Sequence, residues 1–281
     1  MNTLPIGLFD SGVGGLTVLD DLRKRLPQEQ YCYLGDTARL PYGTKSSGTI
    51  IRYSLQATEK LVERQIKLLV VACNTASAAA LPELRKAYAP LPVVGVIEPG
   101  ARAACKAVQN KPGNGSIIVM GTESTIRGAA YTKAIHALEP GANVIGVACS
   151  LFVSLAEEGW MDGPIAESIA ERYLAPALAA SRPDCIVLGC THFPPLAPAI
   201  AAVAGKDVIL VDSAATTAEA VEQKLKKLNL LQPSCQPPSQ TDAPPASLHF
   251  LTTDAPERFA RVGSLFLGMD INPDQLELVA L

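Results

Sequence analysis

The sequence predicts an α/β fold with parallel sheets, divided into two domains. Short apolar runs rich in Val and Ile alternate with longer stretches of helical periodicity along the chain. The apolar runs lack strict alternation of apolar and polar residues, which is typical of strands buried on both faces of a sheet. With 281 residues, the chain has the length of about two domains.

Nine apolar runs are predicted to be strands, because each is bounded by Gly, Pro, Asp or Ser. In chain order they cover residues 6–9, 31–34, 68–72, 93–97, 117–120, 144–148, 186–188, 208–211 and 248–251. The clearest helical stretches between them are 48–64, 76–87, 165–180 and 214–227. Repeated strand–helix units require crossover connections, which make the sheets parallel.

Segment 232–247 differs from the rest, because it holds five prolines among Ser, Gln and Thr. It is predicted to be a surface loop or linker with no core of its own. The block from residue 248 returns to a strand followed by a helix.

The two halves of the chain contain two pairs of similar short sequence patterns. Residues 68–75 and 185–192 both form a strand-like run that ends in Cys and two polar residues, and 6–11 resembles 208–213. Two related domains facing a shared cleft would explain the similarity, and chance would explain such short matches as well.

Composition excludes several classes of protein. The net charge is −3, from 24 basic and 27 acidic residues, so the chain has no cationic excess for nucleic acid. The apolar runs are far shorter than a membrane span of about 20 residues, so no membrane association is expected. The seven cysteines are odd in number and form no C-x-x-C motif. With no signal peptide recognised at the start, this predicts a reducing, cytoplasmic location without a disulfide framework.

Polar residues that directly follow predicted strands are the candidates for a site, since ligands of parallel sheets collect at the carboxyl ends of the strands. They are Asp10–Ser11, Asp36–Thr37, Cys73–Thr75, Thr122, Cys190–His192 and Asp212–Ser213. Two of these pairs have a structural alternative as helix caps: Asp10–Ser11, ahead of the helix after Gly15, and Asp212–Ser213, which we leave out of the site.

Cys73 and Cys190 stand out, because each follows a buried strand and precedes an expected helix start. A helix N-terminus favours the thiolate form of cysteine. Two thiols in matching contexts suit two-base catalysis, in which one thiolate removes a proton from a stereocentre and the opposite thiol returns one. A single activated cysteine with a histidine would instead suit acyl transfer, and His192 lies near Cys190.

Four motifs, in order along the chain, resemble those of the glutamate racemase family. They are Asp10-Ser-Gly-Val-Gly-Gly-Leu16, Leu34-Gly-Asp-Thr-Ala38 with Pro41-Tyr-Gly43, Ala72-Cys-Asn-Thr-Ala76 and Leu188-Gly-Cys-Thr-His-Phe-Pro194. The resemblance implies an isomerase that interconverts L- and D-glutamate and supplies D-glutamate for peptidoglycan synthesis. It also implies two pseudo-symmetric α/β domains with the active site in the cleft between them.

By that resemblance, Cys73 removes the α-proton of D-glutamate and Cys190 that of L-glutamate. The same resemblance assigns substrate binding to Asp10, Ser11, Tyr42, Gly43, Asn74, Thr75, Thr191 and His192. Glu157 matches a further acid of the family near the second cysteine, with its neighbour Glu158 as the alternative placement.

The predicted domain that carries Cys73 comprises residues 1–97 and 209–281, and the domain that carries Cys190 comprises residues 98–208. No cofactor and no metal are expected, because two cysteines supply both bases. Glutamate is the expected small-molecule partner, and a homodimer is the candidate assembly. Rival functions are an aspartate or hydantoin racemase of the same superfamily, a thiol hydrolase or transferase, and a non-catalytic binding protein.

Overall fold

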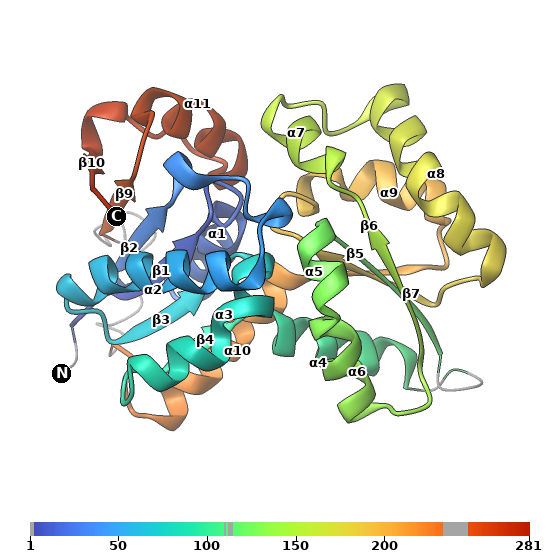
Figure 1. Ribbon diagram of the computed structural model, residues 1–281, viewed down its shortest axis with the longest axis horizontal. Coiled ribbons are helices and arrows are strands. Elements are labelled where there is room, and N and C mark those ends of the chain that lie inside the picture. Colours follow the sequence, from blue (N-terminus) through green and yellow to red (C-terminus); the bar gives the residue numbers. More distant parts are fainter. Residues whose placement is uncertain (1–2, 110, 112–114, 233–246) are drawn as a thin grey trace, which may run out of the picture.

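In the computed structural model, which describes residues 3–109, 111, 115–232 and 247–281, the chain forms two α/β lobes side by side (Figure 1). The first lobe has a six-stranded sheet in the order β10-β9-β2-β1-β3-β4, and the second has a four-stranded sheet in the order β6-β5-β7-β8. Every strand pair in both sheets is parallel. The predicted fold class is therefore confirmed.

The first sheet is built around strands that are buried on both faces. Its strands are β1 (Ile6–Asp10), β2 (Tyr31–Gly35), β3 (Leu68–Val71), β4 (Val93–Gly95), β9 (Leu248–Thr252) and β10 (Leu276–Leu278). Its helices are α1 (Leu16–Arg25), α2 (Ser47–Glu63), α3 (Asn74–Ala87) and α11 (Pro256–Leu267), with short 3-10 turns η1 (Thr37–Arg39), η2 (Tyr42–Thr44) and η5 (Pro273–Gln275). Every residue of β1, β2 and β3 is buried, which explains their unbroken apolar sequences.

The second sheet is smaller, and its outer strands are more exposed. It holds β5 (Ser116–Gly121), β6 (Asn143–Ala148), β7 (Cys185–Gly189) and β8 (Ile209–Asp212). The helices of this lobe are α4 (Ile97–Val108), α5 (Glu123–Gly128), α6 (Ala130–Leu138), α7 (Leu151–Glu157), α8 (Gly163–Ala180) and α9 (Ala197–Ala204), with the 3-10 turn η4 (Pro194–Leu196). The expectation of burial on both faces is wrong for the two edge strands β6 and β8, which both have exposed residues.

All nine predicted strands are present, with small differences in their bounds. The fourth ends at Gly95 and not at Ile97, because the chain turns there and α4 begins at Ile97. The three-residue strand β10 was not predicted. Most of the predicted Pro-rich loop, residues 233–246, lies outside the described residues.

The two sheets repeat one strand order, since β2-β1-β3-β4 in the first lobe corresponds to β6-β5-β7-β8 in the second. Cys73 follows β3 and Cys190 follows β7, so the two cysteines occupy equivalent positions. The similarity between segments 6–11 and 208–213 does not reflect equivalent strands. The first segment holds β1, an inner strand, whereas the second holds β8, an edge strand that corresponds to β4.

The pairing of β8 shows that the chain returns to the first lobe later than the sequence predicted. The prediction began the returning segment at residue 209, but residues 209–212 form β8 and pair with β7. The next helix, α10 (Ser213–Lys227), packs against α1 of the first lobe and also against α4. We therefore keep the two-domain division as a proposal, with the return placed directly after Asp212.

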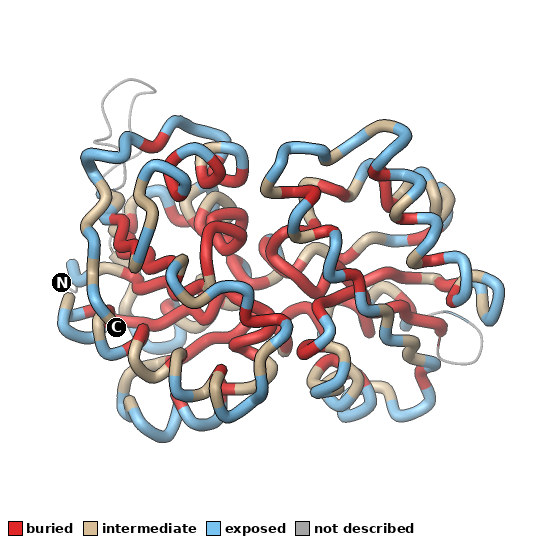
Figure 2. The backbone as a smooth tube through the Cα atoms, turned by 45° about the horizontal axis from the view of Figure 1, so that its top comes forward, coloured by how far each residue is buried: buried red, intermediate tan, exposed pale blue. Residues whose placement is uncertain are grey.

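The lobes are in close contact at the carboxyl ends of their sheets. A Cβ atom at Gly14 would overlap the side chains of Thr191 and His192, so only glycine fits there. A Cβ at Gly43 would likewise overlap Thr122. Figure 2 shows that buried backbone runs through both sheets and meets between the lobes. Among the described residues, no helix is long and apolar enough to cross a membrane.

Candidate active site

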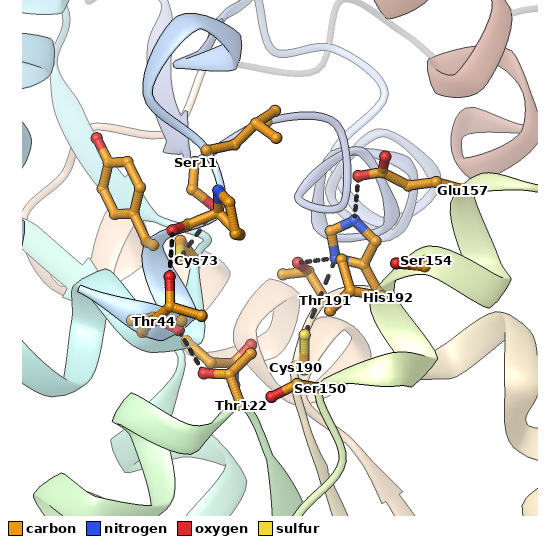
Figure 3. Close-up of a pocket in the computed structure, with 18 of the residues that line it drawn as sticks. Ser11, Thr44, Cys73, Thr122, Ser150, Ser154, Glu157, Cys190, Thr191 and His192 are labelled. Carbon is orange, nitrogen blue, oxygen red and sulfur yellow. Dashed lines mark hydrogen bonds and ion pairs between the residues drawn. The ribbon is translucent and has the colours of Figure 1, made fainter. Parts of the chain in front are cut away.

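A cavity of about 300 Å³ lies between the lobes, at the carboxyl ends of both sheets (Figure 3). It is lined by residues from both lobes: Ser11, Gly12, Leu40, Pro41, Tyr42, Gly43, Thr44, Cys73, Asn74, Thr75, Thr122, Ser150, Val153, Ser154, Glu157, Cys190, Thr191, His192 and Arg258. Every residue that the sequence assigned to catalysis or substrate binding is among them, apart from Asp10.

Cys73 stands directly before α3 and caps its N-terminus. Its Sγ accepts a hydrogen bond from the Ala76 backbone N–H at 3.4 Å and lies 3.5 Å from the Ser11 hydroxyl. Burial raises the pKa of the Cys73 thiol to about 12; the charge of Asp10 adds to the rise, and the two hydrogen bonds oppose it. Cys73 is therefore a protonated thiol at neutral pH.

Asp10 lies behind the cavity wall and is fully buried. Its Oδ2 accepts a hydrogen bond from the Gly12 backbone N–H at 2.8 Å. Burial raises the pKa of Asp10, although the charge of His192 and backbone N–H groups oppose the rise. Helix α1 has no side-chain cap, so the alternative that Asp10 caps this helix is wrong.

Cys190 has a different environment. The expected helix start directly after it is wrong, because α9 begins only at Ala197. The short 3-10 turn η4 (Pro194–Leu196) lies between Cys190 and this helix. In place of the expected helix N-terminus, a histidine lies beside the sulfur. His192 Nδ1 is 3.9 Å from Cys190 Sγ.

His192 links Cys190 to an acidic residue of the same lobe. Its Nε2 lies 3.1 Å from Glu157 Oε1 (Figure 3). Burial by itself would lower the pKa of His192, but hydrogen bonds and charges from Cys190 and Glu157 outweigh burial and raise this pKa to about 10. His192 is therefore an imidazolium at neutral pH, and its positive charge lies beside the Cys190 sulfur.

Glu157, and not its neighbour Glu158, is the acid that reaches the cavity. Its second carboxylate oxygen accepts a hydrogen bond from Arg258 Nη2 at 2.6 Å. Burial would raise the pKa of Glu157, but contacts with His192 and Arg258 reverse this effect and lower it. Sequence reasoning missed Arg258, since an exposed arginine on a C-terminal helix carries no signal of its own.

The floor of the cavity is polar and joins the two lobes. Thr75 Oγ1 of the first lobe lies 2.9 Å from Thr122 Oγ1 of the second, and Asn74 Nδ2 donates to the Tyr131 hydroxyl at 2.8 Å. Asn74 Oδ1 is buried and has no hydrogen-bond partner within the described residues. It is thus an unsatisfied acceptor on a residue that lines the cavity.

The remaining candidates from the sequence have supporting positions. The carboxylate of Asp36 accepts hydrogen bonds from Tyr42, Arg39 and Thr253, and it fixes the Tyr42 ring in the cavity wall. Asp212 caps α10 by accepting from the Ala214 N–H at 2.7 Å, as the cap alternative predicted. In the part of the chain that is described, no group of three or more His, Cys, Asp and Glu side chains could hold a metal ion.

Comparisons with known proteins agree on one family. The family model of Asp/Glu/hydantoin racemases matches residues 17–221. A glutamate racemase of Geobacter metallireducens is 50% identical over 263 residues, which cover 94% of this chain and 92% of that protein.

Solved structures give the same result. A glutamate racemase of Francisella tularensis in complex with D-glutamate superimposes with a TM-score of 0.88 at 34% identity, covering 100% of this chain and 98% of that chain. The Thermus thermophilus enzyme in complex with β-chloro-D-alanine gives a TM-score of 0.85 at 38% identity, with the same coverage.

Proposed function

Because the chain belongs to the Asp/Glu/hydantoin racemase family, we propose that it interconverts L- and D-glutamate with Cys73 and Cys190 as its two bases. One observation carries the proposal: two cysteines at equivalent positions in two parallel sheets line the same cavity from opposite lobes. A planar intermediate between them would receive its proton from the face opposite to the one that lost it, and this inverts the stereocentre.

The surroundings of the two sulfurs suit L-glutamate as the incoming substrate. A Cys190 thiolate stabilised by the His192 imidazolium removes the α-proton, and the Cys73 thiol gives a proton to the opposite face. D-glutamate needs the reverse arrangement, with a thiolate at Cys73. The contact between Cys190 and His192 and the buried carboxyl of Asp10 beside Cys73 support this exchange, because each can take up or give back a thiol proton.

The polar lining suits an amino acid with two carboxylates. Hydroxyl groups of Ser11, Thr75 and Thr122 are donors for these carboxylates, together with the N–H groups at the N-terminus of α3. Asn74 lines the cavity and is the proposed contact of the substrate ammonium group, since its Oδ1 has no hydrogen-bond partner among the described residues. The proposal needs no cofactor, because the two sulfurs carry out both proton transfers.

The biological role that follows is the supply of D-glutamate for peptidoglycan in the cytoplasm. Six cysteines are free in the described structure, which supports a reducing compartment.

A second candidate is acyl transfer by Cys190. The observation in its favour is that Cys190, His192 and Glu157 stand in a row, as nucleophile, base and orienting acid do in thiol hydrolases. This candidate leaves the equivalent position and burial of Cys73 without a role.

The test is incubation with L-glutamate without pyridoxal phosphate, followed by chiral chromatography. We expect D-glutamate to form until the two enantiomers are equal. Cys73→Ser and Cys190→Ser should both abolish conversion, whereas Cys105→Ser, which changes a buried cysteine outside the cavity, should leave it near the wild-type rate. Conversion that survives Cys73→Ser, together with hydrolysis of thioesters that depends only on Cys190, would favour acyl transfer.

A further inference from the structure

Helix α11 belongs to the first lobe, yet it contacts two residues of the second lobe that serve Cys190. Arg258, in its first turn, donates from Nη2 to Glu157 Oε2 at 2.6 Å. Phe266, near its end, packs against the His192 ring with centroids 5.2 Å apart and planes at 74°. The helix thus holds both side chains behind Cys190 from across the lobe boundary.

We propose that Arg258 is a positioning residue for proton transfer at Cys190, a role that rests on the two-base function proposed above. The contacts form one series from Arg258 through Glu157 and His192 to Cys190. Arg258 touches neither sulfur. It acts by holding the Glu157 carboxylate in the orientation that the imidazole requires.

The geometry of Glu157 distinguishes this contact from an ordinary surface ion pair. An exposed pair is worth little, because water and mobile side chains compete with it. The Glu157 side chain is only 13% exposed, and its two oxygens are divided between His192 and Arg258. Without the arginine, one oxygen loses its partner, and the carboxylate can turn away from His192.

The proposal implies a side-specific effect. The hydrogen-bond partners of Cys73, Ser11 and Ala76, belong to the first lobe and are not part of the series that begins at Arg258. A loss of Arg258 should therefore impair proton removal by Cys190 and leave proton removal by Cys73 almost unchanged. A residue that served only to hold the lobes together would affect both sides equally.

Elimination from 3-chloroglutamate separates the two sides. A thiolate removes the α-proton, the β-carbon–chlorine bond breaks to release chloride, and the resulting enamine hydrolyses to 2-oxoglutarate and ammonium. No proton is returned from the opposite face, so the L-isomer reports on Cys190 and the D-isomer on Cys73. Production of 2-oxoglutarate from each isomer is measured for the purified full-length protein.

The variants are Arg258→Met, which keeps length but removes charge, and Arg258→Lys, which keeps the charge. We expect Arg258→Met to lower elimination from the L-isomer by about tenfold, as loss of an orienting partner does at other sites, and to change the D-isomer less than about twofold. Arg258→Lys should recover part of the loss. Arg261→Met, which changes another exposed arginine on α11, is the matched control and should behave as the wild type.

If Arg258→Met lowered elimination equally for both isomers, or for neither, the role of Arg258 would be overturned. The two-base function would still hold if the wild-type protein racemised glutamate. A wild-type protein that does not racemise glutamate would overturn the two-base function, and this role with it.

Discussion

The two cysteine sites have the same place in the topology but control their sulfurs by different means. Cys73 follows β3, caps a helix and is flanked by the buried carboxyl of Asp10, so its thiol keeps its proton. Cys190 follows β7, has no helix directly after it, and lies beside an imidazolium supported by Glu157. Equivalent strands therefore place the two sulfurs in different surroundings, with a buried carboxyl beside Cys73 and an imidazolium beside Cys190.

Replacement of either cysteine is the strongest way to test this comparison. Racemisation should fall by about 10³-fold or more in Cys73→Ser and in Cys190→Ser, because a serine hydroxyl is a far weaker base at neutral pH. Cys190→Ser should still eliminate chloride from the D-isomer of 3-chloroglutamate and not from the L-isomer, and Cys73→Ser should do the reverse. If both variants lost both eliminations, a single nucleophilic cysteine would be the better description.

His192→Asn removes the positive charge that lies beside Cys190. We expect elimination from the L-isomer to fall by about 10²-fold, since general acid–base groups contribute on this scale. Elimination from the D-isomer, which depends on Cys73, should change much less. Steady-state rates with each isomer test this, and a matching fall on the D-isomer would show that His192 serves both sulfurs.

Gly14 tests how closely the first lobe fits against the Cys190 side. Gly14→Ala would drive a methyl group into Thr191 and His192, at a cost of about 1–3 kcal/mol of folding free energy. Because His192 must move, the rate of racemisation should also fall, by about tenfold. Gly48→Ala, at an open position on α2, is the control for chemical denaturation and should leave both unchanged or raise stability slightly.

The pH profile gives the smallest expected effect. The pKa of His192 is raised from its ordinary 6.5 to about 10, so the imidazolium is present below that pH and is lost as pH rises through it. The rate constant kcat/KM for L-glutamate should therefore fall above a pH of about 10. Glu157→Gln removes a hydrogen-bonded charge that raises this pKa, so the fall should move to lower pH by about 1 unit. An unmoved profile would show that another group sets the alkaline limit.

Much of this arrangement could be predicted from the sequence. Buried parallel strands leave long apolar runs, and the polar residues after them fall at one end of the sheets, so Cys73, Asn74, Cys190 and His192 could be placed at a shared site. The motif resemblance added Glu157.

What escaped prediction depends on contacts between distant segments. Arg258 comes beside Glu157 only because α11 packs across the lobe boundary, and no local pattern marks it. The different surroundings of the two sulfurs were missed because matching strand ends suggested matching helix starts. The edge position of β8 was missed for a similar reason, since a short apolar run does not reveal its neighbours in the sheet.

The most direct test of the two-base assignment is racemisation of L-glutamate in D₂O, followed from the first turnovers by mass spectrometry of the separated enantiomers. Cys190 removes the α-proton from one face, and Cys73 delivers a solvent-derived deuteron from the other. The D-glutamate formed should therefore carry one deuterium at Cα, while the remaining L-glutamate stays unlabelled. L-glutamate that gains deuterium as fast as D-glutamate appears, or D-glutamate that keeps its original proton, would contradict the assignment.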